Sequence, residues 1–344
     1  MQERNIGYFF IVFASIIIVL AGIKSASAII VPFLLSLFIA IILSPLYAYI
    51  NKKGLPSIIS LTIVIGLFLI FLISVAKLIG NSAQEFSANI SFYEQQLSAV
   101  LHQFVEVTTK YGIEIPEAEI SNIINTKQIM QFSSTIIQSI GSLFTNGFVI
   151  LLSVVFMLLE SQNFIGKILS ITKNTMVINN IKEITNKIKS YMVLKTVISL
   201  FTGLIIWISL YIIGTDYAFL WAVLAFMLNF IPNIGSIIAA VPAVLLTLVQ
   251  LGSISALIVS GIYVGVNIII GSVIEPKIMG KGLGLSTLVV FLSLLFWGWL
   301  LGIVGMLLSI PLTIMMKIIF YEKENTKWIA VLLGSGDNLK NDNK

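Results

Sequence analysis

The feature that most constrains this chain is a stretch from Tyr217 to Ile274 that contains no Asp, Glu, Lys or Arg. A second uncharged stretch runs from Gly282 to Met316. A helix that crosses a bilayer needs about 20 apolar residues, so each stretch has room for more than one crossing. The whole chain is 58% hydrophobic and only 10% charged, whereas soluble domains carry about 25% charged residues. The sequence therefore predicts an integral membrane protein.

Shorter uncharged stretches precede these two and add further crossings. They are Asn5–Ile23, Ser25–Asn51, Gly54–Ala76, Thr145–Leu159 and Thr196–Thr215. The first is expected to be a retained helix and not a signal peptide, because further apolar segments follow it at once. The predicted fold class is an all-α integral membrane protein with about eight transmembrane helices, broken or re-entrant hairpins in the C-terminal half and a helical extracytoplasmic segment.

The composition argues against several classes of function. The chain has no cysteine and a single histidine, His102, so we expect no metal site. No catalytic or phosphate-binding motif is visible, so we also expect no catalytic residue, no enzyme activity and no cofactor. The net charge of +5 comes from lysines in short loops beside apolar spans. That pattern fits the rule that cytoplasmic loops are positive, and we expect no nucleic-acid partner.

Two polar segments set the expected topology. The charged side chains of residues 81–142 are mostly acidic, whereas those of residues 161–195 are mostly lysines. Because lysine-bearing loops favour the cytoplasm, we predict that the first segment is extracytoplasmic and that both chain termini are cytoplasmic. The predicted regions are 1–80 (three membrane helices), 81–142 (outer helical segment), 143–160 (one membrane helix), 161–195 (cytoplasmic linker), 196–320 (C-terminal membrane core) and 321–344 (cytoplasmic tail).

Both long uncharged stretches are interrupted near their middle. Ile231–Ser236, with the sequence IPNIGS, divides the first, and Trp297–Gly302, with the sequence WGWLLG, divides the second. Each remaining half is short for a full span, and Pro, Gly and Asn favour turns. Paired interruptions of this kind are a sequence pointer to a transport site. We therefore predict broken or re-entrant hairpins, with two ordinary tight helical hairpins as the alternative.

Polar side chains within the uncharged stretch are the candidate substrate path, because amides and hydroxyls in lipid must find partners. Asn229, Asn233, Ser236 and Asn267 are the candidates. Just after the stretch, Glu275, Pro276 and Lys277 form a candidate gate or coupling element, with a helix cap as the structural alternative. Other charges at the ends of spans are expected to be helix-end anchors: Glu160, Lys195 and Asp216.

Two polar helices have apolar stripes. A heptad seam in the outer segment predicts a partner, either the same helix of another subunit or the helix after Pro116. The seam consists of Phe86, Ile90, Tyr93, Leu97, Val100, Phe104 and Val107. A second stripe predicts an amphipathic helix on anionic lipid, or else a solvated connector. It consists of Ile181, Ile184, Ile188 and Met192.

Several segments resemble one known family. Asn229–Pro242, with the sequence NFIPNIGSIIAAVP, and Val273–Leu285, with the sequence VIEPKIMGKGLGL, look like signatures of the autoinducer-2 exporter family of permeases. Leu294–Gly302 and Ser309–Thr313 fit the same family in the same order. Pro232, Gly235 and Gly280 also fall on these motifs. By this resemblance, Pro232 and Gly235 are added to the candidate path, and Gly280 is added to the candidate gate. One departure is Ser236, where the family often has proline.

The resemblance implies a multi-pass protein of the bacterial cytoplasmic (inner) membrane that forms a homo-oligomer. It implies secondary export of a small polar solute such as autoinducer-2, which is a small hydroxylated molecule. Sodium or lithium/proton antiport, with a monovalent cation as partner, is the alternative that some family members suggest. An envelope scaffold that binds its partner through the outer segment is a second alternative. The lipid bilayer is a partner in all three.

Overall fold

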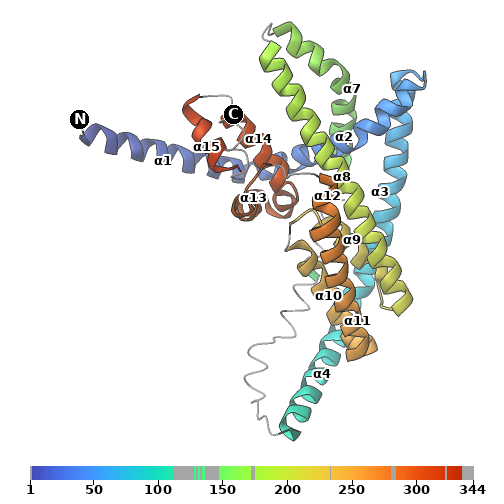
Figure 1. The fold of residues 1–344 in the computed structure, drawn as a ribbon. Coiled ribbons are helices and arrows are strands. Elements are labelled where there is room, and N and C mark those ends of the chain that lie inside the picture. The colour runs from blue at the N-terminus through green and yellow to red at the C-terminus, as the bar shows by residue number, and fades with distance from the viewer. Residues whose placement is uncertain are drawn as a thin grey trace. The chain divides into compact units, whose positions relative to one another are not determined.

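The computed structural model describes residues 2–111, 128, 131, 134–135, 147–171, 175–232, 234–279, 284–321 and 324–334. Within them the elements are helices (Figure 1), and the sole β feature is an isolated bridge between Leu285 and Gly334. In chain order the helices are α1 Gln2–Ser25, α2 Ser27–Lys52, α3 Ser57–Ala88, α4 Ile90–Lys110, α7 Gly147–Ile171, α8 Thr175–Ile213, α9 Ala218–Leu228, α10 Gly235–Leu251, α11 Ser253–Val266, the π-helix η1 Asn267–Ile274, α12 Glu275–Met279, α13 Thr287–Leu307, α14 Ser309–Tyr321, the 3₁₀ turn η2 Glu324–Thr326 and α15 Lys327–Leu332. The predicted all-α class is confirmed.

Five stretches of helix are long and apolar enough to cross a membrane. By length and composition they are Ser27–Lys52, Ser57–Ala88, Thr185–Ile213, Ser253–Ile278 and Thr287–Leu307, the last of which is interrupted at Gly302. Shorter apolar helices accompany them: Phe10–Ser25, Gly147–Glu160, Ala218–Leu228, Gly235–Leu251 and Ser309–Tyr321. Large apolar side chains such as Ile29, Ile212 and Ile254 are exposed on their surfaces, as expected where lipid replaces water. The chain is a multi-pass membrane protein.

The helices form two compact units. Unit 1 comprises Met1–Val64, Asn146–Val193 and Lys281–Lys344, and unit 2 comprises Ile65–Thr145 and Leu194–Gly280. In unit 1, α2 packs along α7, and α14 packs against both α13 and α15. Ser36 links α2 to α7, because its buried hydroxyl lies 3.2 Å from the carbonyl oxygen of Ile150. The same hydroxyl lies 2.6 Å from the carbonyl oxygen of Pro32 within α2.

The predicted interruption in the second uncharged stretch lies in unit 1, within α13. Gly302 has the non-helical torsions φ 68° and ψ −151°, a conformation open mainly to glycine. A Cβ atom at Gly305 would lie 2.0 Å from the carbonyl oxygen of Trp297, although these residues would be about 12 Å apart in a straight helix. The chain therefore folds back here. The indole nitrogen of Trp297 donates to the hydroxyl of Thr313 at 3.0 Å, which fastens the fold-back to α14.

The other predicted interruption lies in unit 2 and separates α9 from α10. At 1.5 Å per residue, the 11 residues of α9 extend about 16 Å, too short for a bilayer core of about 30 Å. A Cβ atom at Gly235 would lie 1.8 Å from the carbonyl oxygen of Leu228. Any larger residue would collide with backbone, so this glycine permits the tight turn between the two helices. The C-terminal half thus contains the broken hairpins that the sequence predicts.

The first part of the heptad seam has a partner that neither sequence alternative named. Phe86, Tyr93 and Leu97 are buried, the Phe86 ring lies 5.8 Å from that of Trp221 on α9, and α4 packs against α10. The Tyr93 hydroxyl lies 3.5 Å from the Asp216 carboxylate. Burial, and then the neighbouring Tyr217 and Asp216, raise the pKa of Tyr93 above its ordinary value, so it remains a neutral donor.

The remaining parts of these stripes are only partly described. The side chains of Phe104 and Val107, residues 112–127 and most of residues 128–146 lie outside the described residues, as do the side chains of Ile181 and Ile184. In the second stripe, Ile188 and Met192 are buried, so at these two positions protein surrounds the side chains and neither lipid nor water does.

Candidate functional site

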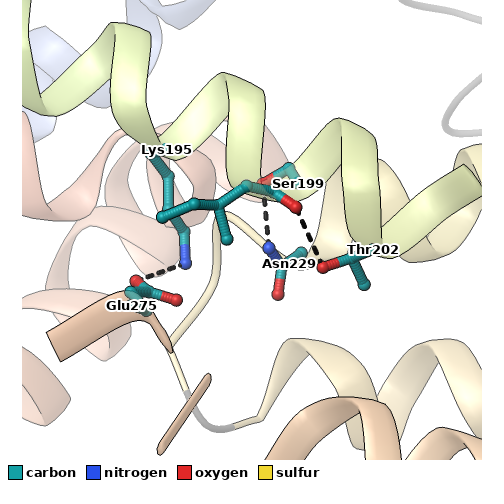
Figure 2. A network of polar contacts seen from close by, with 6 residues as sticks. Lys195, Ser199, Thr202, Asn229 and Glu275 are labelled. Carbon is teal, nitrogen blue, oxygen red and sulfur yellow. Dashed lines mark hydrogen bonds and ion pairs between the residues drawn. The ribbon is translucent and has the colours of Figure 1, made fainter. Parts of the chain in front are cut away.

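A row of polar side chains follows one buried face of α8 in unit 2. Lys195, Ser199 and Thr202 are all buried, and their spacing of four and then three residues places them on the same side of a helix. Figure 2 shows these three residues along α8. Apart from Thr196, the other residues of α8 between Lys195 and Thr202 are apolar, so this buried polar face is a candidate site.

Lys195 forms an ion pair with Glu275, the first residue of α12. The ammonium nitrogen lies 2.6 Å from a carboxylate oxygen, as Figure 2 shows. The Lys195 side chain is only 3% exposed and that of Glu275 is 21% exposed. A buried charge of this kind is tolerated because its partner compensates the lost hydration.

Asn229 joins the same polar face from the end of α9. Its side-chain nitrogen donates to the hydroxyl of Ser199 at 2.9 Å, and Figure 2 shows the two side chains facing each other. The hydroxyl of Thr202 donates to the carbonyl oxygen of Ile198 at 3.1 Å. The hydrogen bond from Asn229 therefore links the broken hairpin of α9 and α10 to α8.

A small cavity lies beside this network, between α8, α9, α10, α11 and η1. Its lining residues are Thr202, Ile206, Ala225, Asn229, Ser236, Tyr263, Val266, Asn267, Ile270 and Gly271. The volume open to the centre of a water molecule is about 10 Å³, which is enough for about one water. Among the described residues, the side chains that line it are all uncharged.

The π-helix η1 connects the cavity to the ion pair. It begins at Asn267, which lines the cavity, and ends immediately before Glu275. A Cβ atom at Gly271 would lie 3.2 Å from the Asn267 side-chain oxygen, so the glycine leaves room for this amide. π-helical turns are rare and occur often at functional sites.

The structure brings three of the predicted path residues together, since Asn229, Ser236 and Asn267 line one cavity although they are far apart in sequence. Two others shape the turn: Gly235 at the close approach described above, and Pro232, whose carbonyl oxygen accepts from the Ile234 amide at 2.6 Å. Asn233 lies outside the described residues.

The predicted gate residues differ in their surroundings. Glu275 contacts Lys195, which the sequence suggested was only a helix-end anchor, and not its neighbour Lys277. Pro276 and Lys277 are exposed, and Gly280 lies outside the described residues. The charged partner in this element is thus 80 residues away along the chain.

Sequence reasoning missed three further residues of this site, Ser199, Thr202 and Tyr263, and favoured a helix-end role for Lys195. Lys195, Ser199 and Thr202 carried a usable signal, because polar residues at spacings of four and three in an apolar helix mark one face. Tyr263 carried no signal of its own, since a tyrosine in an apolar helix is common in packing. Within the described residues, no group of three or more His, Cys, Asp or Glu side chains is placed to hold a metal ion.

The chain is similar to bacterial transport proteins over nearly its whole length. Residues 13–325 match the sequence profile described as AI-2E family transporter. The AI-2 transport protein TqsA of Escherichia coli is 38% identical over 324 residues, which cover 94% of this chain and 94% of that protein. A candidate transport protein of Haemophilus influenzae is 39% identical over 95% of this chain and 96% of its own length. The candidate transport protein YhhT of Escherichia coli is 35% identical over 94% and 93%.

Proposed function

Because this chain belongs to the AI-2E family of transporters, we propose that it is a permease that exports a small polar solute such as autoinducer-2 by secondary transport. The observation that carries the proposal is the uncharged, hydrogen-bonding cavity inside unit 2. The relative TqsA is named as an AI-2 transport protein, which supports autoinducer-2 as the first solute to test.

The lining of the cavity suits a neutral solute. A solute that enters an apolar protein loses its hydrogen bonds to water, which costs several kcal/mol for a polar group that stays unpaired. The amides of Asn229 and Asn267 and the hydroxyls of Ser236 and Tyr263 replace those hydrogen bonds. Since the cavity holds about one water molecule, the structure corresponds to a closed conformation, and passage of a solute requires the surrounding helices to separate.

The Lys195–Glu275 ion pair is the proposed gate of this path. The ion pair connects α8 to α12. Both sides of it lead to the cavity, because α8 carries Thr202 and η1, which directly precedes α12, carries Asn267. Formation of the pair holds these elements together, and its separation accompanies opening. Pro276, Lys277 and Gly280 belong to the same connection and are proposed to set its geometry.

The first experiment measures efflux of autoinducer-2 from proteoliposomes that contain the purified protein. Replacement of Asn229 by Ala is expected to reduce efflux, because it removes both the cavity amide and the hydrogen bond to Ser199. Ser260→Ala is the matched control, since that hydroxyl donates to Ala256 of its own helix and does not line the cavity. Equal efflux by the parent and the well-folded Asn229→Ala variant would remove the cavity from the path.

Sodium or lithium/proton antiport is the second candidate, and the observation that favours it is the presence of Glu275 beside the path. In this case a sodium or lithium gradient drives a pH change across the vesicle membrane, and Glu275→Gln abolishes it. A pH change that persists in this variant would rule out Glu275 as the coupling residue.

The remaining functional proposals concern the setting of the protein. We propose a bacterial cytoplasmic membrane location, cytoplasmic termini and a homo-oligomer. The natural absence of cysteine makes single introduced cysteines clean reporters of which side each loop faces. The scaffold alternative predicts that substitutions at exposed positions of α4, such as Phe92, abolish the cellular phenotype while purified protein still transports.

A further inference from the structure

Two hydroxyl groups that line the cavity have no hydrogen-bond partner within the described part of the chain. They are the side-chain oxygens of Ser236 on α10 and Tyr263 on α11, and both atoms are buried. Tyr263 as a whole is 5% exposed. Buried polar atoms are nearly always paired, so each exception calls for an explanation.

Two other hydroxyl groups of unit 2 are paired, unlike these two. Thr202 donates to Ile198 at 3.1 Å and Ser260 donates to Ala256 at 2.8 Å, each within its own helix. Ser236 is the second residue of α10, so the residue four positions before it, Pro232, lies in the preceding turn and not in the same helix. The hydroxyl of Tyr263 stands at the end of a rigid ring, too far from its own backbone to bond to it.

The two hydroxyls also share one ligand space. Both line the cavity that Asn229 and Asn267 line, so two amides and two unpaired hydroxyls surround a volume that holds about one water molecule in the closed conformation. Each hydroxyl can donate and accept a hydrogen bond. The set matches a ligand that presents neighbouring hydroxyl or carbonyl oxygens and carries no charge.

We propose that Tyr263 and Ser236 are the specificity-determining residues of the path, which bind a hydroxyl-bearing neutral solute through groups kept unpaired for it. This inference rests on the proposed transport function and assigns to Tyr263 a role that its sequence context does not reveal. A site built to hydrogen-bond a substrate group discriminates strongly against ligands that lack the group, because its own polar atoms would then remain unpaired.

The proposal predicts opposite effects on transport and on stability. Tyr263→Phe removes one buried unpaired oxygen and keeps the ring, so the empty protein unfolds at the same or a higher temperature. The same change removes a hydrogen bond to the solute, so the KM for autoinducer-2 efflux rises about five- to tenfold. A residue that merely packs would show the same stability, because the ring is kept, but an unchanged KM, so the KM is the readout that separates the two roles.

The experiment compares the parent with Tyr263→Phe, Ser236→Ala and the control Tyr211→Phe, whose side chain is largely exposed on α8. Efflux of autoinducer-2 from proteoliposomes gives the KM, and thermal unfolding in detergent gives stability. A raised KM with undiminished stability in the first two variants, but not in the control, supports the assignment.

Two results overturn it in distinguishable ways. Efflux by the parent with an unchanged KM in Tyr263→Phe leaves the transport function standing and shows that the two hydroxyls bind water only. No efflux of autoinducer-2 by the folded parent overturns the proposed function and this inference together. Ser236→Ala serves as the second test if Tyr263→Phe does not fold.

Discussion

Removal of either charge from the Lys195–Glu275 pair is expected to destabilise the protein, but by unequal amounts. Glu275→Gln leaves the ammonium of Lys195, which is 3% exposed, without a counter-charge. Breaking a buried pair in this way costs about 3–5 kcal/mol of unfolding free energy. Lys195→Met leaves the Glu275 carboxylate, which is 21% exposed and can be hydrated. That variant should lose less, about 1–2 kcal/mol, between the values for surface and buried pairs.

The double variant Lys195→Met/Glu275→Leu separates pairing from packing. Because both charges are gone and the volume is largely kept, its stability should return to within about 1 kcal/mol of the parent. Unfolding free energies from reversible denaturant titration in detergent micelles give all three differences. Equal losses in the two single variants, or a double variant as unstable as Glu275→Gln, would refute the reasoning from burial.

Three substitutions test the helix packing, and a fourth, Gly261→Ala, is their control. Gly235→Ala should abolish recovery of folded protein, because the new methyl group would lie 1.8 Å from a backbone oxygen, whereas Gly261→Ala, with nothing within 4 Å, should be recovered like the parent. Gly305→Ala should also abolish recovery of folded protein, because its methyl group would lie 2.0 Å from the carbonyl oxygen of Trp297. The yield of monodisperse protein on size exclusion checks the three glycine variants. Phe86→Ala should cost about 3–5 kcal/mol because its ring is buried against Trp221, and parental stability in this variant would contradict the packing of Phe86 against Trp221 on α9.

Much of the fold follows from the sequence because lipid imposes strict rules on an apolar chain. The uncharged stretches predict the helices, and Gly235 and Gly302 lie at the two predicted interruptions. Asn229, Ser236 and Asn267, which line the cavity, are likewise identified from the sequence, since few polar residues occur in the stretch. Local composition is sufficient for these inferences.

The parts that the sequence did not predict depend on contacts between distant segments. Glu275 has Lys277 as a neighbour in sequence, but the helical geometry after η1 directs it to Lys195 on α8. The heptad seam at Phe86 and Tyr93 predicts an apolar partner without saying which one, and the structure supplies α9 and α10. Tyr263 belongs to the site only because η1 and α10 enclose its hydroxyl, and no local pattern reports this.

The small size of the cavity has a consequence for the cell that contains this protein. Protons cross membranes along files of hydrogen-bonded water, and a space for about one water molecule is too short to hold such a file. Close packing around Ala225 and Ile270, which are both buried, leaves this cavity no room for such a file. In the closed conformation, this cavity therefore offers the cell's proton-motive force no path of its own.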